Sequence, residues 1–300
     1  MKFKFLSVVM MSALCFVGSA KAQETSDPQK ETVIVDEFTR TTAVPAYLTE
    51  GIRANVIEGF VSKGRFHVVD ALTNDALKAL SAKRVAEDNV DASNVMNSES
   101  EAVYKSLGAK YLIKGKVTDR TVTREKDVLS DSYSWYSKIS LSLTVYNILD
   151  GSTVASKNIQ LTGVNSDSSE KADMNAVEDA KIEMRSFVDA NFKFKTFIEM
   201  IESVDKKKGA KELYIVGGNE MGIKKGQVFK VYYVKQIGSR TTNQEIGTLK
   251  ADEVMDGLTK CNVTKGGVEI NDIFNSEGRD KLVIESAGNT REKVGGFFGF

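Results

Sequence analysis

A strictly alternating segment near the middle of the chain constrains the fold most. It reads, in order, Ile139, Ser140, Leu141, Ser142, Leu143, Thr144 and Val145. Successive side chains of a β-strand point to opposite faces, so this pattern predicts a strand with one buried apolar face and one polar hydroxyl face. Asp150 and Gly151 favour a tight turn, after which residues 154–161 are expected to form the next strand. The chain therefore contains an antiparallel sheet that must be covered on at least one face.

Helical periodicity surrounds this sheet. After Pro45, a residue favoured in the first turn of a helix, apolar side chains recur at every fourth position. These side chains are Leu48, Ile52, Val56 and Phe60. β-Branched and apolar runs at residues 32–36 and 66–70 predict buried strands. Further helices are expected at residues 73–87, 99–107 and 171–191, and a further strand at residues 111–117. We therefore predict an α/β domain, a mixed sheet flanked by helices, over residues 32–193.

The pattern changes after Phe192, where short apolar runs alternate with glycine-containing turns. The runs are residues 197–204, 212–216, 228–234, 246–251, 258–263 and 281–284. Six short strands separated by turn signals are typical of a small antiparallel barrel or sandwich. We expect a small, mostly-β, barrel-like domain at residues 196–286, followed by a tail at residues 287–300.

The first residues are organised like a secretory signal peptide. Lys2 and Lys4 supply positive charge, residues 5–17 are apolar, and small residues precede a cleavage position after Ala22. The apolar stretch is shorter than the roughly 20 residues that span a bilayer. We therefore expect residues 1–22 to be removed. The protein is then exported and is periplasmic or outer-membrane associated, with membrane contact that is at most peripheral.

The charge of the chain limits the kinds of partner that it can bind, and its cysteine content decides whether disulfides can stabilise it. Removing residues 1–22 takes away three lysines and no acidic residue, so the formal net charge changes from 0 to −3. Binding to nucleic-acid phosphates needs a basic surface, so no nucleic acid is expected as a partner. Cys261 is then the only cysteine, and no intramolecular disulfide can form. Cys15, inside the apolar stretch, leaves lipid attachment open as an alternative to cleavage after Ala22.

The sequence contains no combination of residues typical of a catalytic or metal site. The single histidine, His67, excludes histidine-clustered zinc sites, and its apolar neighbours indicate a structural position on a strand. Cys261 alternates within an apolar strand and is expected to be an inert core residue. The glycines between residues 217 and 226 lack the Ser or Thr and the helix of a phosphate-binding loop, so they predict a turn. We expect no enzyme activity, no cofactor and no metal.

Two aromatic clusters are the candidate protein-contact residues. Tyr133, Trp135 and Tyr136 lie within residues 119–137, a segment whose charges predict a polar loop, and Tyr and Trp are favoured at interfaces. The second cluster lies in the tail and consists of Phe297, Phe298 and Phe300. The hydroxyl face of the alternating strand is expected to be covered by a helix, with a neighbouring subunit as the alternative.

Three segments resemble motifs of the CsgG family and follow each other in that family's order. They are residues 64–70, which read Gly-Arg-Phe-His-Val-Val-Asp, residues 107–117 and residues 143–156. The glycines in these motifs serve turns and helix ends, so the motifs specify a fold and carry no chemistry. The resemblance implies a mixed sheet flanked by helices over residues 32–193.

The second half is similar, in residues 215–229 and 245–247, to the C-terminal domain of the flagellar assembly protein FlgT. Together the resemblances imply a non-catalytic envelope assembly or scaffold protein, of the CsgG-like type, that contacts other envelope proteins and can form a homo-oligomer. CsgG itself is a lipid-anchored pore subunit, so a curli-type outer-membrane secretion pore is one alternative. The charges in residues 119–137 do not suit a lipid-facing strand. A periplasmic hydrolase that uses Asp and Glu is the second alternative.

Overall fold

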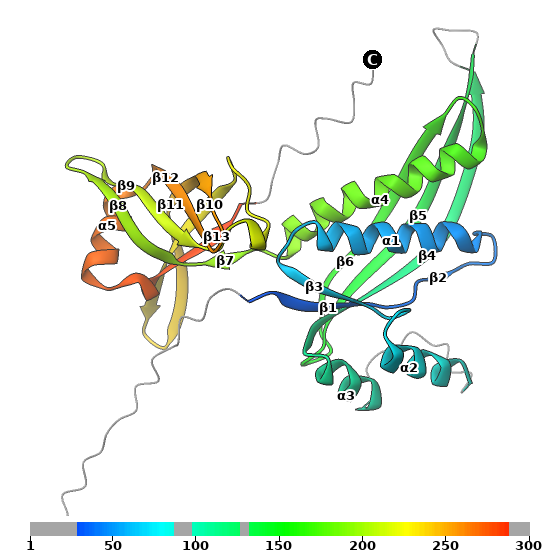
Figure 1. Cartoon of the computed structure of the whole chain (residues 1–300), viewed down its shortest axis with the longest axis horizontal. Coiled ribbons are helices and arrows are strands. Elements are labelled where there is room, and N and C mark those ends of the chain that lie inside the picture. Colours follow the sequence, from blue (N-terminus) through cyan, green and yellow to red (C-terminus); the bar gives the residue numbers. More distant parts are fainter. Residues whose placement is uncertain (1–28, 87–97, 127–131, 288–300) are drawn as a thin grey trace, which may run out of the picture.

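The computed structural model describes residues 29–86, 98–126 and 132–287, which form two sheets lying side by side (Figure 1). The fold class predicted from the sequence is confirmed. A mixed sheet with helices packed on it is followed by a seven-stranded antiparallel sheet that curls into a half-barrel. The predicted contact residues Phe297, Phe298 and Phe300, and the predicted signal peptide, lie outside the described residues.

The first sheet combines parallel and antiparallel strands. Its order is β3 (Phe66–Asp70), β1 (Glu31–Val35), β4 (Ala109–Lys126), β5 (Tyr133–Asn147) and β6 (Thr153–Asn165), with the short β2 (Thr39–Arg40) paired to β4. Strand β1 runs parallel to both β3 and β4, whereas β4, β5 and β6 are antiparallel neighbours. The alternating segment of the sequence is β5, so its apolar side chains all lie on one face.

Helices pack on both faces of this sheet. Helices α1 (Ala46–Val61) and α4 (Ser169–Asn191) cover the face that carries Val33 and Ile113. Helices α2 (Asp75–Ala86) and α3 (Ser98–Ser106) lie on the other side, against Ile34 and Leu112. Side chains of adjacent residues in a strand point to opposite faces, so each strand contributes to both cores.

The hydroxyl face of β5 is polar and half-buried. Helices α2 and α3 cover the sheet near Leu112 and Ile148. Cover of Ser140, Ser142 and Thr144 by a helix stays a prediction. Thr144 approaches Ser156 of the neighbouring strand, with their hydroxyl oxygens 3.4 Å apart.

The second sheet is antiparallel throughout. Its order is β7 (Lys195–Thr196), β13 (Leu282–Ser286), β10 (Val228–Ile237), β11 (Arg240–Val254), β12 (Leu258–Lys265), β9 (Gly209–Val216) and β8 (Ile198–Asp205). Helix α5 (Gly267–Ser276) buries Ile270 in the core of this sheet, together with Phe229 and Leu249. A chain of three residues after α4 leads directly into β7, so the last turn of α4 lies where the two sheets meet.

Candidate protein-contact surface

The outer parts of β4 and β5, residues 119–126 and 133–140, form an arm whose tip continues beyond the helices (Figure 1), and β6 pairs with β5 along this arm as far as Trp135. Their pairing runs without interruption from Asp119 opposite Ser140 to Lys126 opposite Tyr133. The prediction of a polar loop in this region is therefore wrong. The segment contains the β-branched residues Thr121, Val122 and Thr123, and residues 123–126 at the end of β4 are exposed, so charged side chains are compatible with an extended strand there.

An arginine holds two of the predicted contact residues together. The guanidinium of Arg124 lies 4.9 Å from the ring centre of Tyr133 and 5.4 Å from that of Trp135. Arg124 is directly opposite Trp135 in the strand pairing. Such cation–π contacts contribute about 0.5–1 kcal/mol each at exposed sites. We call Arg124, Tyr133 and Trp135 the aromatic face of the arm.

Tyr136, the third predicted residue of this cluster, is not part of the aromatic face. It is adjacent to Trp135 in strand β5, so its side chain points to the opposite face of the arm. The side chain of Tyr133 is 47% exposed, and those of Trp135 and Tyr136 are half-buried. The arm thus presents two aromatic side chains on one face and one on the other.

The base of the arm is fixed to helix α4 by a buried carboxylate. Asp173 is fully buried and accepts hydrogen bonds from Arg120 Nε at 3.0 Å and Nη2 at 2.6 Å, and from the Ser137 hydroxyl at 2.6 Å. The hydrogen bond to Asp173 raises the pKa of Arg120. Burial, with the charge of Asp173 as the next cause, raises the pKa of Tyr47 on α1. Both strands of the arm and α4 are therefore joined at one point.

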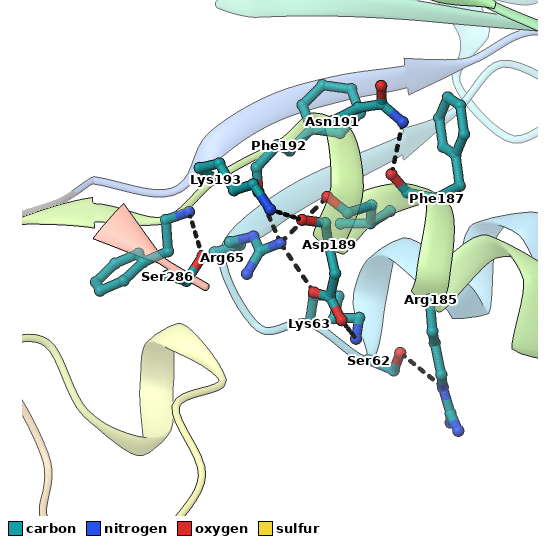
Figure 2. A network of polar contacts seen from close by, with 12 residues as sticks. Ser62, Lys63, Arg65, Arg185, Phe187, Asp189, Asn191, Phe192, Lys193 and Ser286 are labelled. Atoms are coloured by element: carbon teal, nitrogen blue, oxygen red, sulfur yellow. Dashed lines mark hydrogen bonds and ion pairs between the residues drawn. The ribbon is translucent and has the colours of Figure 1, made fainter. Parts of the chain in front are cut away.

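A second charged cluster lies at the opposite end of α4, where the two sheets meet. Figure 2 shows Lys63 and Arg65 converging on Asp189, with Arg185 reaching back to Ser62. The Lys63 Nζ to Asp189 Oδ2 distance is 2.7 Å, and the Arg65 Nη2 to Asp189 Oδ1 distance is 3.3 Å. Arg65 belongs to the Gly-Arg-Phe motif, whose residues are expected from the sequence to specify the fold alone.

Two glycines bring the two halves into direct contact beside this cluster. Gly64 has a φ of +70° and Gly222 a φ of +72°, values that favour glycine. A Cβ atom on Gly222 would lie 1.9 Å from the carbonyl oxygen of Lys63. The predicted turn between residues 217 and 226 is therefore also a packing surface: it folds through the short 3₁₀ helix Asn219–Met221 and rests on the turn that precedes β3.

The two residues with reactive side chains, His67 and Cys261, lie at an exposed sheet edge and in a buried core. His67 is exposed on the edge strand β3. Cys261 is fully buried, and burial raises the pKa of its thiol to about 12, so it is protonated at neutral pH. Among the described residues, no three His, Cys, Asp or Glu side chains are grouped so that they could hold a metal ion. Across the same ranges, every helix is too short or too polar to cross a membrane.

The sequence did not predict the charged groups that pair with these residues, namely Arg124 beside Trp135 and Arg120 beside Asp173. Arg124 is separated from Trp135 by ten residues, and Arg120 from Asp173 by 52, so only the strand register and the packing of α4 bring each pair together. The feature of the sequence that could have indicated these pairs was the charge of the two arginines. An arginine in a strand that leads to a buried face needs a carboxylate partner, because an unpaired buried charge is costly.

Comparisons with known proteins give distant structural similarity only. No protein-family model matches the chain, and no curated protein matches its sequence. The solved structures similar to it include lipoprotein GNA1162 from Neisseria meningitidis, at 12% identity over 46% of this chain and 86% of that one, with a TM-score of 0.31. They also include the PelC dodecamer from Paraburkholderia phytofirmans, at 16% identity over 52% and 91%, with a TM-score of 0.32. The LpoB C-terminal domain from Salmonella enterica is similar at 12% identity over 47% and 87%, with a TM-score of 0.26. Similarities this distant assign neither a family nor an activity to the chain.

Proposed function

We propose that this chain is an exported, non-catalytic assembly or scaffold protein of the cell envelope that acts by contact with other envelope proteins. The observation that carries the proposal is the arm, which extends beyond its helices and displays the aromatic face. The resemblance of three sequence segments to the CsgG family supports the same class of function.

The arm has the physical properties of a contact element. Its base is fixed by the Arg120–Asp173 pair, so little conformational entropy is lost when a partner binds. Tyr, Trp and Arg are the residues most enriched at the energetic centres of protein interfaces. Arg124 already orders Tyr133 and Trp135, which leaves both rings positioned for a partner.

Site-specific photocrosslinking in the native host tests the proposal. A photoreactive phenylalanine analogue is placed at Trp135 and, as a matched control on the opposite face of the arm, at Thr123. We expect discrete crosslinks to one or a few envelope proteins from position 135 and much weaker ones from position 123. In an otherwise wild-type background, Trp135→Ala is expected to lower co-purification of the same proteins by at least tenfold, since hot-spot residues contribute about 2 kcal/mol or more.

Two outcomes would overturn the proposal. Crosslinks only between copies of this chain, in detergent-dependent rings, would favour the pore alternative. Equal crosslinking from positions 123 and 135, with co-purification unchanged by Trp135→Ala, would remove the aromatic face as the contact element.

A further inference from the structure

A small cavity between the two sheets is lined by an excess of positive charge. Its volume is about 50 Å³, and its charged lining consists of Lys63, Arg65, Arg185 and Lys224, with Asp189 as the one carboxylate among its lining residues. The chain as a whole has equal numbers of basic and acidic residues. The excess of three positive charges is therefore local, and we call this site the junction cavity.

The single carboxylate is already occupied by two of the cations. Asp189 accepts from Lys63 and from Arg65, one on each carboxylate oxygen. Arg185 donates through Nε to a neutral serine hydroxyl at 3.3 Å. Lys224 forms no ion pair within the described residues. Arg185 and Lys224 thus have no anionic partner there. Arg185 is half-buried, where an uncompensated charge is unfavourable, and Lys224 is exposed.

Arg65 adds a buried donor that is not used. Its side chain is nine-tenths buried, with 8% of the residue exposed. Nη2 donates to the carbonyl oxygen of Phe192 at 2.8 Å, whereas Nε has no hydrogen-bond partner in the described part of the chain. Burial lowers the pKa of Arg65, and the charge of Asp189 opposes this shift without cancelling it. Buried guanidinium donors are almost always paired, so an orphaned one indicates a missing acceptor.

The second half of the chain contributes neutral donors to the same cavity. Ser286 Oγ accepts from the backbone N–H of Phe194 at 3.0 Å, which leaves its hydroxyl hydrogen available to a ligand. Gln227 Oε1 accepts from the backbone N–H of Lys224 at 3.2 Å, which leaves its amide N–H groups available in the same way. Both residues line the cavity. Donors from both halves of the chain therefore line one small cavity. In Figure 2, Arg65 and Ser286 lie on one side of Asp189, and Arg185 is directed toward Ser62.

We propose that the junction cavity binds a phosphate group, with Arg65, Arg185 and Lys224 as its cationic ligands. A phosphate is a compact anion with several acceptor oxygens, and guanidinium groups recognise it through paired N–H donors. A planar carboxylate would use fewer of the donors that converge from both sheets. Because the ligands come from both halves, a bound phosphate stabilises the contact between the two sheets.

A larger basic cavity on the other side of Arg65 does not offer the same site. It has a volume of about 410 Å³ and is lined by Lys110, Lys193 and Lys195. Lys110 is paired with Glu31, and Lys195 with Glu285 at 3.1 Å. Its cations are therefore largely compensated within the chain, whereas those of the junction cavity are not.

Calorimetry and thermal unfolding of the full mature chain with inorganic phosphate test the proposal. Titrations are made at constant ionic strength with chloride as the balancing ion. We expect phosphate to raise the melting temperature of the wild type. Arg185→Gln and Lys224→Gln are each expected to raise the dissociation constant for phosphate by at least about tenfold, the effect of losing one charge-assisted hydrogen bond.

Lys225→Gln is the matched control. It removes the same charge one residue away, from a side chain that is 78% exposed and paired with Asp252, and binding should be unchanged.

A second pair of measurements identifies the source of the phosphate. Vesicles that contain phosphatidic acid, whose headgroup is a phosphate monoester, are compared with vesicles of phosphatidylcholine alone in flotation assays. Flotation with phosphatidic acid that Lys224→Gln abolishes and Lys225→Gln preserves assigns the site to a lipid headgroup. Binding of inorganic phosphate without flotation assigns it to a soluble phosphate. No phosphate-dependent change in either assay, or a change that is equal in Lys224→Gln and Lys225→Gln, overturns the proposal.

Discussion

Near each of its ends, helix α4 pairs a carboxylate with an arginine of the first half of the chain, but the surroundings of the two pairs differ in charge. At the start of the helix, Asp173 is fully buried and receives Arg120 and one serine hydroxyl. At its end, Asp189 receives both Lys63 and Arg65, and further cations stand nearby. The first cluster contains one cation, Arg120, which is compensated by Asp173 and lies near Glu170, whereas the second has an excess of positive charge.

This difference in charge indicates that the Asp173 cluster is a structural contact and that the Asp189 cluster is a binding site. In the balanced cluster, donors from both strands of the arm meet one carboxylate, so its contribution is to hold the arm against α4. In the cation-rich cluster a buried donor of Arg65 is left without an acceptor among the described residues. Ionic groups that are mutually satisfied inside a chain have no capacity left for a ligand, whereas an unsatisfied set does.

The largest effect is expected from breaking the balanced cluster. Asp173→Asn leaves the Arg120 cation without a counter-charge, which should lower the free energy of unfolding by about 3–5 kcal/mol, measured by urea unfolding. Asp167→Asn is the control, because it removes a carboxylate just before the same helix. Its partner Lys171 and Asp167 itself are exposed, so the loss in the free energy of unfolding should be much smaller than that of Asp173→Asn. Equal losses for the two variants would contradict a structural role for the buried pair.

The cation-rich cluster should respond less to the equivalent change. Asp189→Asn is expected to lower the free energy of unfolding by about 2–3 kcal/mol, because Asp189 is less buried than Asp173 and Arg65 still donates to the carbonyl oxygen of Phe192. If the junction cavity binds phosphate, added phosphate should restore part of this loss, as seen by comparing melting temperatures in phosphate and in chloride. Glu183→Gln, which removes a partly exposed carboxylate of the same helix, should show a smaller loss and no such restoration. A loss for Asp189→Asn that phosphate leaves unchanged would mean that an anion cannot reach the cluster.

The contact between the two sheets can be tested through its glycines. Both Gly222→Ala and Gly257→Ala place alanine at a positive φ, which costs about 1 kcal/mol. Only at Gly222 does the added Cβ meet the backbone of the first half, since Gly257 has open space around it. Gly222→Ala should therefore cost about 1–3 kcal/mol more in the free energy of unfolding. Equal losses would show that the two halves do not rest on each other at this point.

Periodicity in the sequence was sufficient to predict most of the scaffold. The alternation in residues 139–145 and the four-residue spacing after Pro45 correspond to β5 and α1, because each pattern has a single secondary structure that buries all its apolar side chains. Helix α5 was not predicted. It is short and begins at glycine, although Ile270, Ile273 and Phe274 have helical spacing. Short helices leave weaker periodic signals than long ones.

The candidate sites were less accessible to sequence reasoning, for a physical reason. The charges within residues 119–137 favour a solvated loop, yet Arg120 is partly buried because Asp173 compensates it. Grouping Tyr133 with Trp135 on one face, apart from Tyr136, requires the register of the arm. Long-range pairing depends on packing, which a single sequence does not specify. The contact role of these residues and of the tail phenylalanines stays a prediction.

A third arginine–carboxylate pair, Arg53 with Asp70, provides the smallest expected effect. Burial alone would raise the pKa of Asp70, but hydrogen bonds from Arg53 and from the backbone N–H of Leu72, with the charge of Arg53, outweigh it and lower the pKa. The folded pKa is thus below the unfolded one. The stabilisation it provides is therefore fully present above the unfolded value of about 3.9 and is lost as the pH falls through the folded value. Urea unfolding between pH 2.5 and 6 should show that the difference in stability between wild type and Asp70→Asn is constant above about pH 5 and shrinks below about pH 4. A difference that stays constant down to pH 2.5 would mean that Asp70 remains ionised throughout, or that the unfolded chain keeps the same ion pair.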